Sequence, residues 1–250
     1  MRLPRASIAG TITVADGGAA VAGALVCAAY AGAELTVEER RQPTCARSGA
    51  DGGYQLDTLA PGAWNLTASA DGRPPARWRG PLPELAPAVR VEAGEAKRGI
   101  DLVLRPGGVR VRGVVNDIGG GPIADAWVAV ESTRVDDTAF HTRSGADGSF
   151  TAWLMPGDVR ASATADGYAE GRGEGVAPTE QLEILLSPGA TLAGVMVEAG
   201  TGTPVEGATV VAEGTWWEAG STGSARTNER GEFRITGLQP GRYKPTAQAT

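Results

Sequence analysis

Residues 145–159, GADGSFTAWLMPGDV, contain the features that decide the fold. An Asp-Gly step at 147–148 is followed by an alternating stretch that begins at Phe150 and ends at a Pro-Gly step at 156–157. Such steps are typical of tight turns, because glycine adopts positive φ without steric cost and proline fixes its own φ. Alternate side chains of a strand point to opposite faces of a sheet. The stretch therefore predicts a β-strand between two turns, with Phe150 entering a core.

These landmarks occur three times along the chain. Each copy has a glycine in an opening strand, a turn glycine followed two positions later by an aromatic residue, and a Pro-Gly step. The opening-strand glycines are Gly10, Gly113 and Gly194; the turn glycines are Gly52, Gly148 and Gly231; the Pro-Gly steps are at 61–62, 156–157 and 240–241. Their spacing gives units of about 80 to 100 residues, the size of small domains rather than solenoid repeats.

Each unit alternates apolar and polar residues, as in VRVRGVV at 109–115. This pattern predicts an all-β chain of tandem β-sandwiches, each with its own core. We expect the units to cover residues 1–105, 106–187 and 188–250. The third would stop before its closing strand, so we also expect a piece of a longer array whose last sandwich has an unpaired edge. The short links LRPGG at 104–108 and LSPGA at 186–190 predict a semi-rigid rod.

The landmarks resemble those of the carboxypeptidase regulatory-like domain. The residues that carry the resemblance are Gly113 and Gly194, the segments PIADA at 122–126 and PVEGA at 204–208, the turn DGSF at 147–150, and LQPGRY at 238–243. The first unit departs from the pattern, since GGAAVAGA at 17–24 lacks the proline. The resemblance implies a transthyretin-like (prealbumin-like) Greek-key sandwich. Such domains are accessory modules of secreted and surface bacterial proteins, grouped with carbohydrate-binding-like sandwiches.

Composition argues against two classes of partner. The net charge is −6, and Lys97 and Lys244 are the only lysines, so binding to nucleic acid by neutralising phosphates is not expected. No apolar stretch is long enough to cross a bilayer. The first twenty residues lack the continuous apolar core of a signal peptide.

We expect no catalytic residue, metal or cofactor in this chain. His141 is the single histidine and has no HExxH or HxxE motif around it, which favours an exposed histidine at a strand edge. Aspartates such as Asp51 and Asp147 lie at turns without the spacing of a calcium loop, so turn formation explains them better than calcium binding.

Two cysteines, Cys27 and Cys45, fall on strands that the repeat register makes neighbours. A disulfide between them would add about 3 kcal/mol by the chain-entropy estimate and would indicate an oxidising compartment. The alternative is a pair of buried free thiols.

Tryptophans offer a candidate ligand site. Trp216 and Trp217 are adjacent, so on a strand their side chains face opposite ways and at least one would meet solvent. Together with Trp127 they could stack on the apolar faces of sugar rings. The alternative is a core tryptophan with a loop cap.

We therefore expect a non-enzymatic spacer, display or adhesion segment of an extracellular, periplasmic or cell-surface protein. Its partners would be a glycan or protein surface and the neighbouring repeats of the same chain. The alternatives are a carbohydrate-binding module and an accessory domain of a larger peptidase or outer-membrane transporter.

Overall fold

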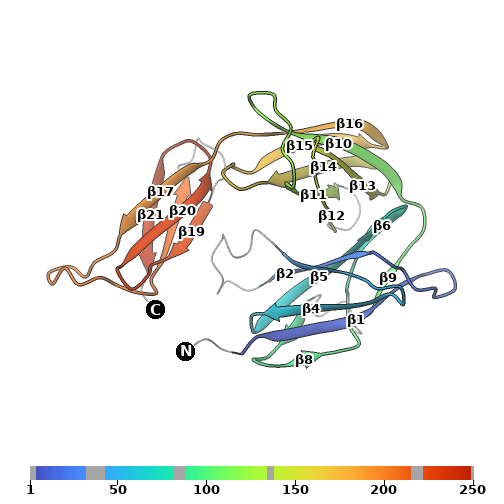
Figure 1. Ribbon diagram of the computed structural model, residues 1–250, viewed down its shortest axis with the longest axis horizontal. Helices are drawn as coiled ribbons and strands as arrows, with labels where there is room; N and C mark the ends of the chain where they lie inside the picture. Colours follow the sequence, from blue (N-terminus) through green and yellow to red (C-terminus); the bar gives the residue numbers. More distant parts are fainter. Residues whose placement is uncertain (1–3, 32–42, 81–87, 134–137, 215–221, 249–250) are drawn as a thin grey trace.

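The computed structural model describes residues 4–31, 43–80, 88–133, 138–214 and 222–248. Within these ranges the chain forms strands, turns and bends and contains no helix, hence none that could cross a membrane. The strands form separate sheets that pack in pairs as three sandwiches (Figure 1). The predicted fold class, all-β with tandem sandwiches, is confirmed.

The first sandwich consists of β1 (Ala6–Val14), β2 (Leu25–Tyr30), β3 (Thr44–Arg47), β4 (Gly53–Leu59), β5 (Gly62–Ala70), β6 (Arg73–Arg77), β7 (Val89–Val91), β8 (Ala96–Lys97) and β9 (Leu102–Leu104). One sheet has the order β4-β1-β8, with β9 also on β1, and the other has the order β3-β2-β5-β6, with β7 also on β5. β1 is antiparallel to β4 and parallel to β8 and β9. Apolar side chains such as Ile8, Leu56 and Leu66 fill the space between the sheets.

The second sandwich consists of β10 (Val109–Asp117), β11 (Trp127–Ser132), β12 (Phe140–Arg143), β13 (Ser149–Leu154), β14 (Gly157–Thr164), β15 (Gly171–Ala177) and β16 (Thr179–Leu186). Its sheets have the orders β13-β10-β16 and β12-β11-β14-β15. β16 runs parallel to β10, and β15 runs antiparallel to β14. The consecutive strands β15 and β16 thus give one strand to each sheet and close the core around Val111, Phe150 and Ile184.

The third sandwich consists of β17 (Ala190–Val195), β18 (Thr209–Gly214), β19 (Thr222–Arg226), β20 (Glu232–Leu238) and β21 (Tyr243–Gln248). Its sheets have the orders β17-β20 and β19-β18-β21. Among the described residues, β17 pairs only with β20 and β21 only with β18. The buried core here consists of Val210, Ala212, Ile235 and Leu238.

The opening-strand glycines of the first two sandwiches are required by a close approach of backbone. A Cβ atom on Gly10 would overlap the carbonyl oxygen of Ile100, and one on Gly113 would overlap that of Leu182. Ile100 lies in the short segment between β8 and β9, and Leu182 lies in β16, so in each sandwich the part of the chain that runs parallel to the opening strand passes over the glycine. A close approach of this kind is a recognised reason for glycine inside a strand.

The three sandwiches do not form a straight rod. The links between them are as short as the sequence indicates, but the first two sandwiches lie side by side, with the third beyond the second (Figure 1). The sheet that contains β2, β5 and β6 faces the second sandwich, while the sheet that contains β1 and β4 lies on the far side. The first joint is therefore built from sheet faces as well as from the link.

Candidate functional site at the interface of the first two sandwiches

The outer faces of the first two sandwiches meet around a cleft. β6 contacts β13, and β12 contacts both β5 and β2. The cleft has a volume of about 630 Å³, and both sandwiches contribute to its lining. The lining residues that bear on its chemistry are Cys45, Arg47, Asp71, Trp127, His141 and Arg143.

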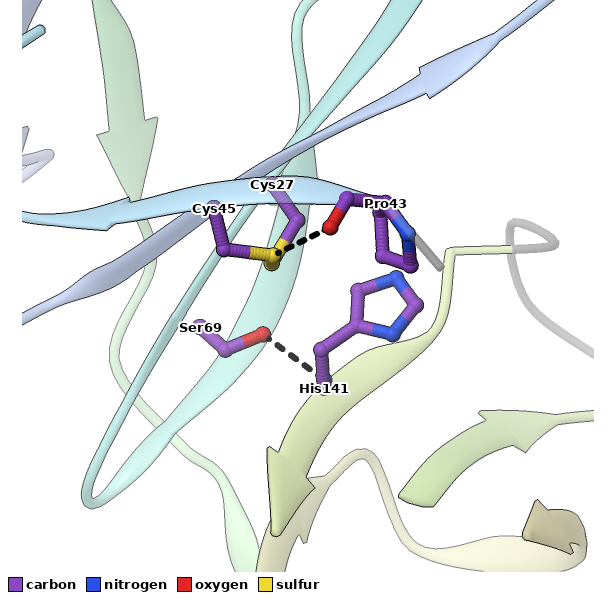
Figure 2. The surroundings of a disulfide bond; sticks show 5 residues. All are labelled: Cys27, Pro43, Cys45, Ser69 and His141. Carbon is purple, nitrogen blue, oxygen red and sulfur yellow. Dashed lines mark hydrogen bonds between the residues drawn. A yellow bond between two sulfur atoms is a disulfide. The ribbon is translucent and has the colours of Figure 1, made fainter. Parts of the chain in front are cut away.

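The two walls of the cleft are built from equivalent positions of the repeat. Arg47 and Arg143 each precede the sequence Ser-Gly-Ala-Asp-Gly, so β3 and β12 are equivalent strands. Two positions earlier, the first sandwich has Cys45, which pairs across the ladder with Cys27. In the second sandwich the same position is His141, whose cross-strand partner is Ala129. The disulfide of one sandwich therefore faces the histidine of the other (Figure 2).

A disulfide joins Cys27 and Cys45 directly across β2 and β3, with their Cα atoms 4.1 Å apart. It ties the edge strand β3 to the sheet on the face that meets the second sandwich. Of the two states that the sequence left open, the structure contains the bonded one. Both sulfur atoms are used in this bond, so the disulfide stabilises the wall of the cleft and neither cysteine can act as a thiol nucleophile.

His141 is held against both walls of the cleft. Its backbone N–H donates to Ser69 Oγ at 3.1 Å (Figure 2), and its ring stacks on Trp127 with centroids 5.5 Å apart and planes inclined by 24°. Its Nδ1 atom is buried and has no hydrogen-bond partner among the described residues. Burial lowers the pKa of His141 to about 4, because the imidazolium form would lose its hydration. The imidazole is therefore neutral at pH 7.

The expectation of an exposed histidine was wrong. β12 is an edge strand, as expected, but the first sandwich covers its outer face. Alternation along a strand tells which side chains leave the core of their own domain. It does not tell that a second domain packs on that outer face.

Trp127 takes part in the same cluster. The guanidinium carbon of Arg143 lies 5.3 Å from the centroid of the Trp127 ring, within the range of a cation–π contact. Arg143 also donates to the backbone oxygen of Asp125 at 3.1 Å and forms an ion pair with its carboxylate at 3.0 Å. Trp127 thus packs within an interface cluster.

Trp216 and Trp217 lie outside the described residues, so sugar binding by these tryptophans stays a prediction.

The aspartates at the repeated turns act on the backbone. Asp147 Oδ1 accepts hydrogen bonds from the N–H and the hydroxyl of Ser149, and these bonds lower the pKa of Asp147. Asp51 Oδ1 accepts from the N–H of Gly53 at 2.9 Å. In the part of the chain that the structure describes, no group of three or more His, Cys, Asp or Glu side chains is placed to hold a metal ion.

The glycines at the two joints were missed by the sequence reasoning. Gly108 and Gly189 each lie five residues before an opening-strand glycine, and that shared spacing is the signal that could have found them. A Cβ atom on Gly108 would lie 2.9 Å from the carbonyl carbon of Arg73. One on Gly189 would lie 2.8 Å from the Cα atom of Gly237 in β20 and 3.0 Å from the carbonyl carbon of Tyr168. Arg73 and Tyr168 each follow an Asp-Gly turn, so both joints press a link against the same part of the preceding sandwich.

Hydrogen bonds complete the second joint. The N–H of Gly189 donates to the oxygen of Gly167 at 2.8 Å, and the N–H of Ala169 donates to the oxygen of Ser187 at 3.0 Å. Gln239 lies in the turn after β20, and its side-chain Nε2 donates a hydrogen bond to the backbone oxygen of Glu170 at 2.8 Å. The third sandwich is therefore attached to the second by one main-chain and one side-chain hydrogen bond in addition to the covalent link.

Residues 191–250 match the family described as "Carboxypeptidase regulatory-like domain", which confirms for the third sandwich the resemblance found in the sequence. Similar solved structures include the shaft pilin SpaA of Lactobacillus rhamnosus GG, 10% identical over 75% of this chain and 98% of that one, with a TM-score of 0.28. A streptococcal ancillary pilin is 12% identical over 98% of this chain and 90% of that one, with a TM-score of 0.33.

A third similar structure is the Bacillus anthracis TIE protein. It is 14% identical over 99% of this chain, with a TM-score of 0.28, and the chain spans 46% of its length. A search of the curated proteins found no match.

Proposed function

We propose that this chain is a non-catalytic spacer and display segment of a secreted or cell-surface bacterial protein. It comprises three domains with boundaries near residues 105 and 187. The observation that carries the proposal is the pair of joints. At each joint a link glycine lies against the backbone of the preceding sandwich, and Gly189 also lies against the backbone of β20, so that an added methyl group would meet backbone atoms at 3.0 Å or less. Links that pack in this way hold adjacent domains at a set angle, unlike flexible linkers that behave as random coils.

The interface of the first two sandwiches supports the same role. The disulfide fixes the wall on one side, and the stack of His141 on Trp127 forms the wall on the other. A structural disulfide persists in an oxidising compartment, which fits a protein that works outside the cytoplasm. A spacer there must keep its shape, and these groups stabilise one arrangement of two domains.

The test is a measurement of shape in solution. Small-angle X-ray scattering of the intact chain should give a single distance distribution that matches the structure. Gly108→Val and Gly189→Val should each broaden it, because the added side chain separates the link from the preceding sandwich. Gly121→Val is the matched control, since a Cβ atom on Gly121 meets no atom within 4 Å. A wild-type distribution as broad as that of the joint variants would contradict a spacer of fixed geometry.

A further inference from the structure

Equivalent turns of the first two sandwiches differ by one side chain. The segments AVAGA at 20–24 and PIADA at 122–126 occupy the same place in the repeat, so Gly23 is the equivalent of Asp125. Both residues have positive φ, 73° for the glycine and 57° for the aspartate. Their N–H groups donate to the backbone oxygens of equivalent serines, at 2.9 and 3.0 Å. The two turns therefore share a backbone conformation, and only the second carries a carboxylate.

An arginine holds each of these turns in the same way. Arg47 Nη1 donates to the backbone oxygen of Gly23 at 3.0 Å, and Arg143 Nη1 donates to that of Asp125 at 3.1 Å. Arg143 also pairs with the carboxylate of Asp125, at 3.0 Å. Gly23 offers no such group to Arg47, and a Cβ atom on Gly23 would meet no atom within 4 Å. There is therefore room for one carboxylate beside Arg47.

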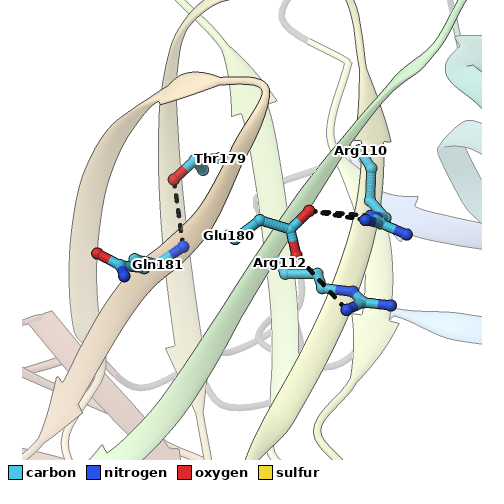
Figure 3. Close-up of polar contacts among 5 residues, drawn as sticks. All are labelled: Arg110, Arg112, Thr179, Glu180 and Gln181. Carbon is cyan, nitrogen blue, oxygen red and sulfur yellow. Dashed lines mark hydrogen bonds and ion pairs between the residues drawn. The ribbon is translucent and has the colours of Figure 1, made fainter.

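The described arginines of the second sandwich all have carboxylate partners. Arg110 and Arg112 both pair with Glu180, at 2.8 and 3.5 Å (Figure 3). Two further arginines pair with glutamates at 4.0 and 3.2 Å. Arg47 forms no ion pair with an acidic side chain that the structure describes. Its guanidinium keeps donors for a carboxylate from outside the chain, and guanidinium–carboxylate pairs are among the strong hydrogen-bonded contacts.

The room beside Arg47 belongs to the cleft between the first two sandwiches. Gly23, Arg47 and Asp71 all line this cleft, whose volume is about 630 Å³. Sites for small ligands have volumes of about 300 to 1,000 Å³ and form preferentially at domain interfaces. Asp71 is exposed and has no ion-pair partner among the described residues. Because a carboxylate only accepts hydrogen bonds, Asp71 favours a ligand with hydroxyl donors and disfavours a second negative charge.

The opposite wall of the cleft contributes an unpaired polar atom. Figure 2 shows the ring of His141 turned towards Pro43 and Cys45, which also line the cleft. Nδ1 of this ring is buried and has no hydrogen-bond partner among the described residues. A buried polar atom without a partner costs free energy, and a ligand hydroxyl would supply the missing bond. The hydroxyls of Thr142 and Thr151 line the same cleft and can bond to further ligand hydroxyls.

We propose that the cleft binds a small hydroxylated carboxylate of the sugar-acid class. Its carboxylate pairs with Arg47 in the position that Asp125 occupies at Arg143. Its hydroxyl groups donate to Asp71 and bond to Nδ1 of His141. The site takes one negative charge, because Asp125 already neutralises Arg143. This binding role is separate from the spacing role, although a ligand that contacts both walls also holds the two sandwiches together.

The experiment titrates three probes into the intact chain at pH 7 and follows the amide NMR signals of Gly23, Arg47 and His141. D-Glucuronate carries a carboxylate and hydroxyls, D-glucose carries the hydroxyls alone, and acetate carries the carboxylate alone. Glucuronate should give saturable shifts and bind at least tenfold more tightly than glucose or acetate. Glucuronate without a saturable shift, or with an affinity equal to that of either other probe, would overturn the proposal.

Gly23→Asp tests the position of the carboxylate. This variant gives Arg47 the partner that Arg143 already has, and aspartate accepts the positive φ here as Asp125 does. Glucuronate binding should fall at least tenfold without loss of thermal stability. Gly99→Asp is the matched control and should bind as the wild type does, since Gly99 has a φ of 74°, open space around it and a place outside the cleft lining. Unchanged binding by Gly23→Asp would overturn the proposal.

Arg47→Gln tests the cation independently. It removes the positive charge and should weaken glucuronate binding at least tenfold. Arg112→Gln removes an arginine that already pairs with Glu180 and should leave binding unchanged. Equal binding by Arg47→Gln and the wild type would overturn the proposal. Should Arg47→Gln fail to fold, Gly23→Asp decides the question alone.

Discussion

The first two sandwiches, which we call the closed pair, and the third sandwich share their landmarks but differ in how far their cores are closed. All three have the opening-strand glycine, the turn and the Pro-Gly step. In the closed pair the glycine is covered by a parallel strand, and the central aromatic residue is buried. In the third sandwich the same residues are half-exposed. The repeated landmarks therefore determine the turns and the pairing of the opening strand, whereas burial depends on the strand that closes the sandwich.

The largest expected effect comes from the opening-strand glycine. Gly113→Val should destabilise the second sandwich by about 4 kcal/mol, because the new side chain would overlap both the carbonyl of Leu182 and the ring of Phe150. Gly194→Val should cost only about 1 to 2 kcal/mol, since it displaces one aromatic ring that has room to move. Chemical denaturation followed by hydrogen exchange of peptides from each sandwich would separate the two unfolding free energies.

Gly121→Val serves as the control for both glycine variants, because its side chain would point into open space. Equal losses of stability for Gly113→Val and Gly194→Val would show that the closing strand is not what separates the closed pair from the third sandwich.

The sequence was sufficient for everything that depends on local pattern. The turn at 147–148, the burial of Phe150 and the alternation along β10 follow from residue types and spacing alone. It was insufficient where two domains meet. The pattern that places His141 on an outer face is the same whether water or another sheet covers that face. Likewise, Gly108 and Gly189 were assigned to links, and only their distance to the preceding sandwich shows why glycine is needed there.

Removal of the disulfide should affect the closed pair and leave the third sandwich unchanged. Replacing both Cys27 and Cys45 by serine should destabilise the first sandwich by about 3 kcal/mol, since the bond closes a loop with a sequence separation of 18. Hydrogen exchange of β2 and β3 should increase first, because β3 is an edge strand held by this bond. The wild-type chain in reducing agent should show the same change. An equal increase in β18 and β19 would mean that the sandwiches do not unfold separately.

Acid should loosen the closed pair through His141. Its pKa is lowered from 6.5 in the unfolded chain to about 4 in the folded one, so the unfolded state binds the proton more tightly. Above pH 6.5 His141 is neutral in both states and does not lower the free energy of unfolding. As the pH falls from 6.5 towards 4, the unfolded chain takes up a proton and the free energy of unfolding decreases, by about 2 to 3 kcal/mol in all.

The pH effect can be separated from the titration of carboxylates by a matched variant. His141→Phe keeps an aromatic ring against Trp127 but cannot take up a proton, so its stability should stay level between pH 6.5 and pH 5 while that of the wild type declines. The difference between the two stability curves is the contribution of His141. Parallel curves would show that His141 does not cause the loss of stability in acid. Because His141 is the single histidine of the chain, the third sandwich should show no change in this window.

The smallest expected effect concerns the hydroxyl that only the first sandwich has at its central aromatic position. Tyr54 donates to the oxygen of Ile100 at 2.6 Å in a buried setting, and burial raises the pKa of Tyr54. This is the same carbonyl that lies over Gly10, so the phenol holds the closing strand in place. Tyr54→Phe should cost about 1 kcal/mol and speed hydrogen exchange in β9. Tyr243→Phe removes a half-buried hydrogen bond to the oxygen of Gln239 in the third sandwich and should cost less. If the two substitutions had equal effects, burial by the closing strand would not strengthen the bond made by Tyr54, and the contrast between closed and open cores would lose its energetic basis.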